Sequence, residues 1–262
     1  MPRTVVYLCP GARCDVVPYT FYRHAHPDVL LDIRHVDVAG YDPRQGDDLL
    51  QLAGRGLALD AANVDAVVVG GSAFSFGFTW DELLLRAEQA SEQAGVPVMT
   101  DMMVVVAQMR SAGASRVTVA HRLAGVADDS VRRFFVSAGF DCAGVVASPQ
   151  AMTANLTDSL TAGAADAERL AADAVALDAT SDSIVLLGGT WWVGPAHSLV
   201  ASAGRRFFNN VLGIAEHFAG STKQGAPAPI TGQLRARRAA PTDADPEDVP
   251  GRGTARSGGD QW

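Results

Sequence analysis

Two segments of this 262-residue chain share a pattern suited to chemistry. They read Asp65-Ala-Val-Val-Val-Gly-Gly-Ser72 and Asp182-Ser-Ile-Val-Leu-Leu-Gly-Gly-Thr190. In each, an apolar run predicts a buried strand and the glycines predict the turn that ends it. Glycine lets backbone N–H groups approach a ligand closely, and a hydroxyl adds another donor. The pair therefore predicts two similar loops that bind an anion such as a carboxylate. The residues concerned are Gly71, Ser72, Gly188, Gly189 and Thr190.

Two residues that follow predicted strands are candidates for proton transfer. Asp101 comes directly after the apolar run that ends at Thr100, and His121 comes after the strand pattern of residues 116–120. Asp101 is a candidate general base and also a candidate N-cap of the next helix, where aspartate is favoured; the two roles are compatible, because a cap at the carboxyl end of a strand also faces the cleft. His121 titrates near neutral pH, although a buried structural histidine fits the same position. The neighbouring Arg122 suits bidentate carboxylate binding, unless it is simply solvated.

The cysteines and histidines do not form a metal-binding pattern. The three cysteines are Cys9, Cys14 and Cys142, and their number and spacing fit neither a disulfide framework nor a zinc site. Cys9 ends the first predicted strand, so it is either a proton donor or a buried, inert thiol. His24 and His26 lack further ligands nearby in the sequence. We therefore expect no bound metal.

The elements that must position these residues are strands alternating with helices. Continuous apolar runs, rather than alternating ones, predict parallel sheets covered on both faces. The predicted strands are residues 4–8, 31–36, 66–69, 96–99, 116–120, 141–146, 184–187 and 205–208. Helices are expected from a capping box at residues 79–82 to residue 95, and over residues 103–112, 128–138, 156–177 and 209–218. In such α/β proteins ligands bind beyond the carboxyl ends of the strands.

Composition limits the partners. The formal net charge of −8 disfavours nucleic acid and anionic membranes, and no apolar stretch is long enough to span a bilayer. The N-terminal residues read as a strand and not as a signal peptide, which favours a cytoplasmic location. Residues 221–262 are poor in apolar residues and are expected to be disordered. The expected partner is a small-molecule carboxylate, and a homo-oligomer stays possible.

Five segments in order carry a family resemblance: residues 67–76, 95–100, 109–117, 181–189 and 211–220. Together they resemble the aspartate/glutamate racemase superfamily, most closely its arylmalonate decarboxylase and maleate isomerase branch. The resemblance implies two Rossmann-like α/β lobes with parallel sheets, related by a pseudo-two-fold axis. It also implies one cofactor-free active site between the lobes. The first lobe would span residues 1–109 with 209–220, and the second residues 110–208.

The chain departs from this family at its thiols. The family's cysteines match Gly71 and either Gly188 or Gly189, so thiol-based proton transfer is unavailable. The resemblance implies that Ser72 and nearby N–H groups cradle a carboxylate, while Ala73 lacks one family hydroxyl. Further residues expected to line the substrate site are Cys9, Pro10, Thr100 and Arg122.

The function that follows is a cofactor-independent lyase or isomerase acting on a small carboxylic acid. His121 or Asp101 would move the proton that the absent thiols cannot. Decarboxylation, cis–trans isomerisation, racemisation and hydration all stay open. The alternatives are a non-catalytic carboxylate-binding homologue, and a hydrolase or cyclase that reuses the oxyanion-binding loops with water activated by His121. Fold alone does not decide among these.

Overall fold

The computed structural model describes residues 3–10, 16–38, 42–55, 64–123, 125–148, 156–188 and 193–219, without the side chains of residues 16 and 156–164. The predicted tail, residues 221–262, lies outside this part of the chain, as do Gly189 and Thr190. No helix within the described ranges is long and apolar enough to cross a membrane.

The chain forms two four-stranded parallel sheets with the same strand order. The first contains β1 (Arg3–Pro10), β2 (Val29–Val36), β3 (Ala66–Val69) and β4 (Val98–Thr100), in the order β2-β1-β3-β4. The second contains β5 (Arg116–His121), β6 (Asp141–Ala147), β7 (Ser183–Leu187) and β8 (Arg206–Asn209), in the order β6-β5-β7-β8. The predicted α/β class and two-lobe architecture are therefore confirmed. All eight predicted strands are present. The apolar runs of β1, β3 and β7 are buried along most of their length, as expected for strands covered on both faces.

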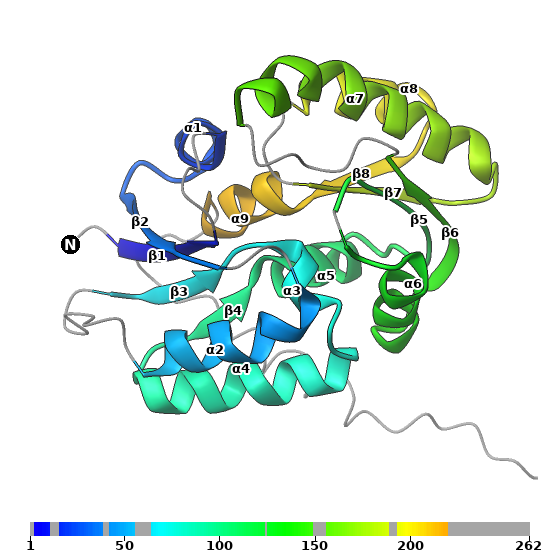
Figure 1. Ribbon diagram of the computed structural model, residues 1–262. Helices are drawn as coiled ribbons and strands as arrows, with labels where there is room; N and C mark the ends of the chain where they lie inside the picture. Colours follow the sequence, from blue (N-terminus) through cyan, green and yellow to red (C-terminus); the bar gives the residue numbers. More distant parts are fainter. Residues whose placement is uncertain are drawn as a thin grey trace, which may run out of the picture.

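Helices cover the sheets, as Figure 1 shows. They are α1 (Val16–His24), the 3-10 turn η1 (Pro43–Gln45), α2 (Gly46–Gly54), α3 (Ser72–Ser75), α4 (Trp80–Ala94), α5 (Asp101–Ser111), α6 (Asp128–Ser137), α7 (Leu156–Leu177), α8 (Gly194–Ser202) and α9 (Asn210–Ala219). The five predicted helices correspond to α4, α5, α6, α7 and α9. We did not predict α1, whose β-branched and aromatic residues favour helix weakly. Its helix is stabilised by packing, since the buried Phe21 contacts Phe218 of α9 with ring centroids 6.5 Å apart.

The two aspartates that open the repeated segments have the same structural task in both lobes. Asp65 accepts a hydrogen bond from the backbone N–H of Thr4 at 2.7 Å, joining the start of β3 to the start of β1. Asp182 accepts from the backbone N–H groups of Ser115 at 3.0 Å and Arg116 at 3.2 Å, joining β7 to β5. The likeness between the two segments therefore extends to their amino ends.

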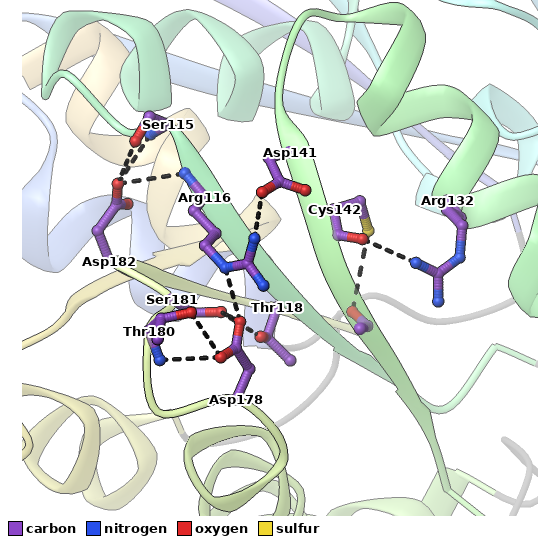
Figure 2. A network of polar contacts seen from close by, with 11 residues as sticks. Ser115, Arg116, Thr118, Arg132, Asp141, Cys142, Asp178, Thr180, Ser181 and Asp182 are labelled. Carbon is purple, nitrogen blue, oxygen red and sulfur yellow. Dashed lines mark hydrogen bonds and ion pairs between the residues drawn. The ribbon is translucent and has the colours of Figure 1, made fainter.

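In the second lobe this junction is a larger polar network (Figure 2). The Arg116 guanidinium donates to Asp178 at 2.8 Å and forms an ion pair with Asp141. Ser181 in turn contacts Asp178 at 3.1 Å. These residues lie at the amino ends of the strands, opposite the edge where ligands bind in α/β folds. The network stabilises the second lobe and lies away from the candidate site.

One apolar core joins the two sheets. It contains side chains of β1, β3 and β4 together with those of β5, β7 and α6. Across the boundary, Phe76 packs edge-on against Phe134 with centroids 5.3 Å apart, and the backbone N–H of Trp80 donates to Ser137 at 2.8 Å. The helix α9 follows the last strand of the second sheet but packs against α1 and α5 of the first lobe. The residue boundaries that we predicted for the lobes stay a prediction.

Candidate functional site

The strand register places several predicted residues at one edge of the first sheet. Leu8 of β1 pairs with Val69 of β3, and Val69 pairs with Thr100 of β4. The carboxyl ends of these three strands are therefore level with one another. Pro10 at the end of β1, the Gly70–Ser72 turn after β3 and Asp101 after β4 therefore meet at the edge where α/β folds bind ligands.

The Gly-Gly turn after β3 is closely packed. Gly71 has φ of 89°, in the left-handed region that favours glycine. A Cβ atom at Gly71 would lie 2.7 Å from Pro10 Cγ and 2.7 Å from a ring carbon of Phe74. At Gly70 it would lie 2.1 Å from the Tyr7 hydroxyl. A side chain at Gly70 would require Tyr7 to shift, and one at Gly71 would require Pro10 and Phe74 to shift, so a cysteine is disfavoured where the family resemblance expects one.

Asp101 lies at the centre of this edge and is fully buried, with 0% of its surface exposed. Its Oδ2 accepts a hydrogen bond from Ser72 Oγ at 3.0 Å and another from Asn210 Nδ2 at 3.0 Å. Asn210 is the first residue of α9, directly after β8. Since β4 and β8 are the last strands of their sheets, the bond to Asn210 joins the carboxyl ends of the two lobes.

The cap of α5 is Thr100 and not Asp101. Thr100 Oγ1 accepts from the backbone N–H of Met103 at 3.2 Å, and Ser75 Oγ donates to the same oxygen at 3.2 Å. Of the two roles that we considered for Asp101, the N-cap is therefore wrong. The physical reason is that β4 runs one residue further than expected, so Thr100 has the extended backbone of a cap. This leaves the Asp101 carboxyl available for other contacts.

Burial raises the pKa of Asp101 from 3.8 to about 6, although hydrogen bonds from Asn210 and Ser72 and smaller contributions from the N–H groups of Met102 and Gly71 lower it. Both close donors contact Oδ2. Among the residues that the structure describes, none hydrogen-bonds to Oδ1. A proton on this carboxyl would therefore reside on Oδ1. A carboxyl that titrates near neutral pH with one oxygen unpaired is suited to acid/base chemistry.

The predicted residues of the second lobe have local partners. His121 Nδ1 accepts from the backbone N–H of Leu123 at 3.2 Å, so its Nε2 carries the proton and donates to Asp128 at 3.1 Å. Burial lowers the pKa of His121, although Asp128 raises it. The buried Arg122 lies 3.8 Å from Asp166. Their proposed roles toward a ligand stay predictions.

Other predicted residues are distributed as follows. Cys9 and Ala73 are buried next to the site, on β1 and α3. Gly188 follows β7 with φ of 130°, again in the region that favours glycine, and Gly189 and Thr190 lie outside the described residues. Within those residues no three His, Cys, Asp or Glu side chains are placed to hold a metal ion.

Our sequence analysis missed Asn210. The available signal was the pair Asn209-Asn210 at the junction of a predicted strand and a predicted helix. Asn209 Oδ1 caps α9 through the backbone N–H groups of Val211 at 3.0 Å and Leu212 at 3.1 Å. Thr100 and Asn209 are thus equivalent caps in the two lobes, and Asp101 and Asn210 are the equivalent residues that follow them.

Comparison with known proteins places the fold. No protein-family model and no curated protein sequence matches the chain. Solved structures do match: arylmalonate decarboxylase aligns at 17% identity over 86% of this chain and 96% of its own length, with a TM-score of 0.65. This chain has the fold of arylmalonate decarboxylase. A glycine-to-cysteine variant of arylmalonate decarboxylase in its sulfate-associated form aligns at 19% identity over 86% and 97% of the two chains, with a TM-score of 0.68.

Maleate isomerases share the arylmalonate decarboxylase fold. The Pseudomonas putida S16 enzyme aligns at 15% identity over 81% of this chain and 90% of its own, with a TM-score of 0.66. A cysteine-to-serine variant of the Nocardia farcinica enzyme, which carries a covalently bound succinylcysteine intermediate, aligns at 16% identity over 81% and 89%, with a TM-score of 0.65. The resemblance inferred from the sequence is confirmed at the level of the fold.

Proposed function

We propose that this chain is a cofactor-independent lyase or isomerase acting on a small carboxylic acid, with Asp101 as its acid/base residue. The observation that carries the proposal is the Asp101 carboxyl itself. It is buried at the carboxyl edge of the sheet, burial raises its pKa to about 6, and its Oδ1 has no hydrogen-bond partner in the described parts of the chain. Arylmalonate decarboxylase and maleate isomerase, which share the fold, act on small carboxylic acids.

Asp101 is a better candidate than His121. The two ring nitrogens of His121 are engaged by the N–H of Leu123 and by Asp128, within the loop between β5 and α6. An imidazole with both nitrogens occupied needs to break a hydrogen bond before it exchanges a proton with a substrate. Asp101 Oδ1 has no such hydrogen bond to break, although the packing that buries it must open for a substrate.

The carboxyl also lies near the place where the family resemblance expects a thiol. That place corresponds to Gly71, and Asp101 bonds to the next residue, Ser72. We infer that the acid/base group comes from β4 in place of β3. In the reaction, a C–H bond beside the substrate carboxylate breaks, its proton passes to Asp101 Oδ1, and the electron pair moves into the carboxylate as an enediolate. Return of a proton to the carbon completes the exchange. After loss of carbon dioxide, the same group would protonate the enediolate.

The test is deuterium exchange followed by proton NMR in deuterated water, with a panel of malonates, maleate, amino acids and 2-hydroxy acids. We expect exchange beside a carboxylate for the wild type. Asp101→Asn should slow it by roughly a hundredfold or more, the usual effect of losing a general acid/base. Asp129→Asn, on the exposed first turn of α6, is the matched control and should exchange like the wild type. Equal exchange by the Asp101 and Asp129 variants would overturn the assignment.

The alternative is a non-catalytic binder of a carboxylate. It is favoured by one observation, since the proposed acid/base residue Asp101 has 0% of its surface exposed. Stabilisation of the fold by a member of the panel, with no deuterium exchange of any member, would support this alternative and reject the enzyme.

A further inference from the structure

We propose that Ser72, Asn210 and the adjacent backbone N–H groups form a carboxylate-binding site that the Asp101 side chain occupies as an internal ligand. Once that side chain is shortened, the site takes a free small monocarboxylate. The binding site is defined by this chain's own contacts and does not depend on the proposed reaction.

The donors converge on one oxygen from separate elements. Ser72 Oγ belongs to the turn after β3 and Asn210 Nδ2 to the start of α9, and both lie 3.0 Å from Asp101 Oδ2. Both side chains are buried, with 2% and 3% of their surfaces exposed. The Asn210 amide is held by its neighbour, since its Oδ1 accepts from Asn209 Nδ2 at 3.5 Å. Donors that are dry and fixed in this way suit a carboxylate wherever it comes from.

Two helix N-termini offset part of the cost of burying a negative charge here, although burial still leaves the pKa of Asp101 raised to about 6. The 11-residue α5 begins at Asp101 and the 10-residue α9 begins at Asn210, so the positive ends of two helix dipoles meet here. In the described part of the chain no Lys, Arg or His forms an ion pair with Asp101, so neutral donors hold its charge. Asp101 Oδ1 is buried without a hydrogen-bond partner among the described residues, so the side-chain donors of this site hold Oδ2.

Because the Asp101 carboxylate already occupies this site, fewer classes of acid can be the substrate; this step rests on the proposed function. A substrate carboxylate placed against Ser72 would meet the ionised Asp101, and two carboxylates in one buried site repel strongly. The substrate would therefore carry one carboxylate, bound by other groups. Dicarboxylates should be poor ligands of the wild type.

The experiment matches the size of the vacated space to the probe. Asp101→Ala removes the carboxyl group, and formate has the size to replace that group. Asp101→Gly removes the methylene group as well, and acetate has the size to replace the whole side chain. We would measure thermal unfolding and calorimetric binding with sodium formate or acetate against sodium chloride at equal ionic strength. Formate should bind Asp101→Ala at least about tenfold more tightly than it binds the wild type, the value of one or more hydrogen bonds to a charged group.

The double variant S72A/D101A is the control, and it should lose most of the formate binding. Formate binding equal to that of the wild type in a folded Asp101→Ala, or undiminished in the double variant, would overturn the proposal. If Asp101→Ala does not fold, Asp101→Gly with acetate gives the same two outcomes. If Asp101→Ala binds formate but the wild type catalyses no deuterium exchange of any acid, the carboxylate-binding site is supported and only the proposed reaction is rejected. Exchange of dicarboxylates in preference to amino acids and 2-hydroxy acids by the wild type would contradict the substrate class alone.

Discussion

Asp101 and Asn210 occupy equivalent positions in the two lobes and are hydrogen-bonded to each other at 3.0 Å. Each follows the last strand of its sheet and begins a helix, at the place where the two sheets' carboxyl ends meet. One is an acid and the other an amide. The pseudo-two-fold axis therefore relates a group that can carry a proton to one that cannot, and the chemistry of the site is one-sided.

The first prediction concerns stereochemistry. A single acid/base residue returns the proton to the face from which it was taken, whereas inversion needs a second acid on the opposite face. A chiral substrate should therefore exchange its α-hydrogen for deuterium without racemising. Chiral chromatography of the recovered substrate, taken after NMR shows complete exchange, checks this. Recovery of a racemate would mean that another group, such as His121, donates from the other face.

The second prediction concerns the pH dependence of stability. The folded pKa of Asp101, about 6, lies above the ordinary 3.8, so the folded state binds more protons than the unfolded state between these values. The stability that protonated Asp101 contributes is thus complete below pH 3.8 and is lost as the pH rises through 6. The loss at pH 7 is on the order of 3 kcal/mol. Asp101→Asn should be more stable than the wild type at pH 7 and nearly equal to it at pH 4, measured by urea unfolding. An equal difference at both pH values would contradict the shift.

The third prediction separates backbone strain from crowding at Gly71. Gly71 and Gly139 share φ of 89°, but a Cβ at Gly139 would have no atom within 4 Å. Gly139→Ala should cost about 1 kcal/mol of unfolding free energy, for the backbone alone. Gly71→Ala should cost a further 1–3 kcal/mol or so, because Pro10 and Phe74 must shift. Equal losses in the two variants would show that the turn relaxes easily.

The fourth prediction separates His121 from the chemistry. His121→Asn keeps an acceptor near the N–H of Leu123, while His121→Leu removes both hydrogen bonds. We expect a loss of about 1–3 kcal/mol in the leucine variant and less in the asparagine variant. Deuterium exchange should persist in both folded variants. Because burial lowers the pKa of His121, its contribution is present above its ordinary pKa of 6.5 and is lost on acidification. Loss of exchange in both variants, with the fold intact, would return His121 to the leading role.

The fifth prediction compares the two repeated aspartates. Asp182 accepts from both the N–H and the hydroxyl of Ser115, from the N–H of Arg116 and from the hydroxyl of Ser183. Asp65 accepts from Thr4. Removing Asp182 with alanine should cost about 3 kcal/mol, and removing Asp65 about 1.5 kcal/mol.

The fall of the unfolding free energy at low pH, the acid limb of the stability curve, provides a second check on Asp182. Although burial raises its pKa, hydrogen bonds from Ser183, Ser115 and the backbone lower it to about 2. Its contribution is therefore present above pH 3.8 and is lost as the pH falls toward 2. Asp182→Ala should flatten this limb in urea unfolding. Equal costs for the two alanine variants at pH 7 would contradict the ranking.

The sheets could be predicted from sequence because a buried parallel strand leaves an uninterrupted apolar run, as in residues 66–69 and 184–187. The sequence also predicted in part that Ser72 and Asp101 lie close together, since both come after strands of one sheet. The contact with Asn210 was not predicted, because it depends on how one lobe docks on the other. The helix α1 was missed since tertiary packing around Phe21 overrides its low helix propensity. Thr100 and Asp101 both suit a cap, and a one-residue difference in where β4 ends decided between them.

The packing around Gly71 makes the absence of the thiol difficult to reverse. A cysteine introduced there by a single substitution would meet Pro10 and Phe74 on a backbone that disfavours any side chain. Placing a thiol at Gly71 without loss of stability would require matching changes at Pro10 and Phe74. In this fold a thiol at Gly71 therefore competes with the packing of the turn, whereas the Asp101 carboxyl reaches Ser72 without disturbing that packing.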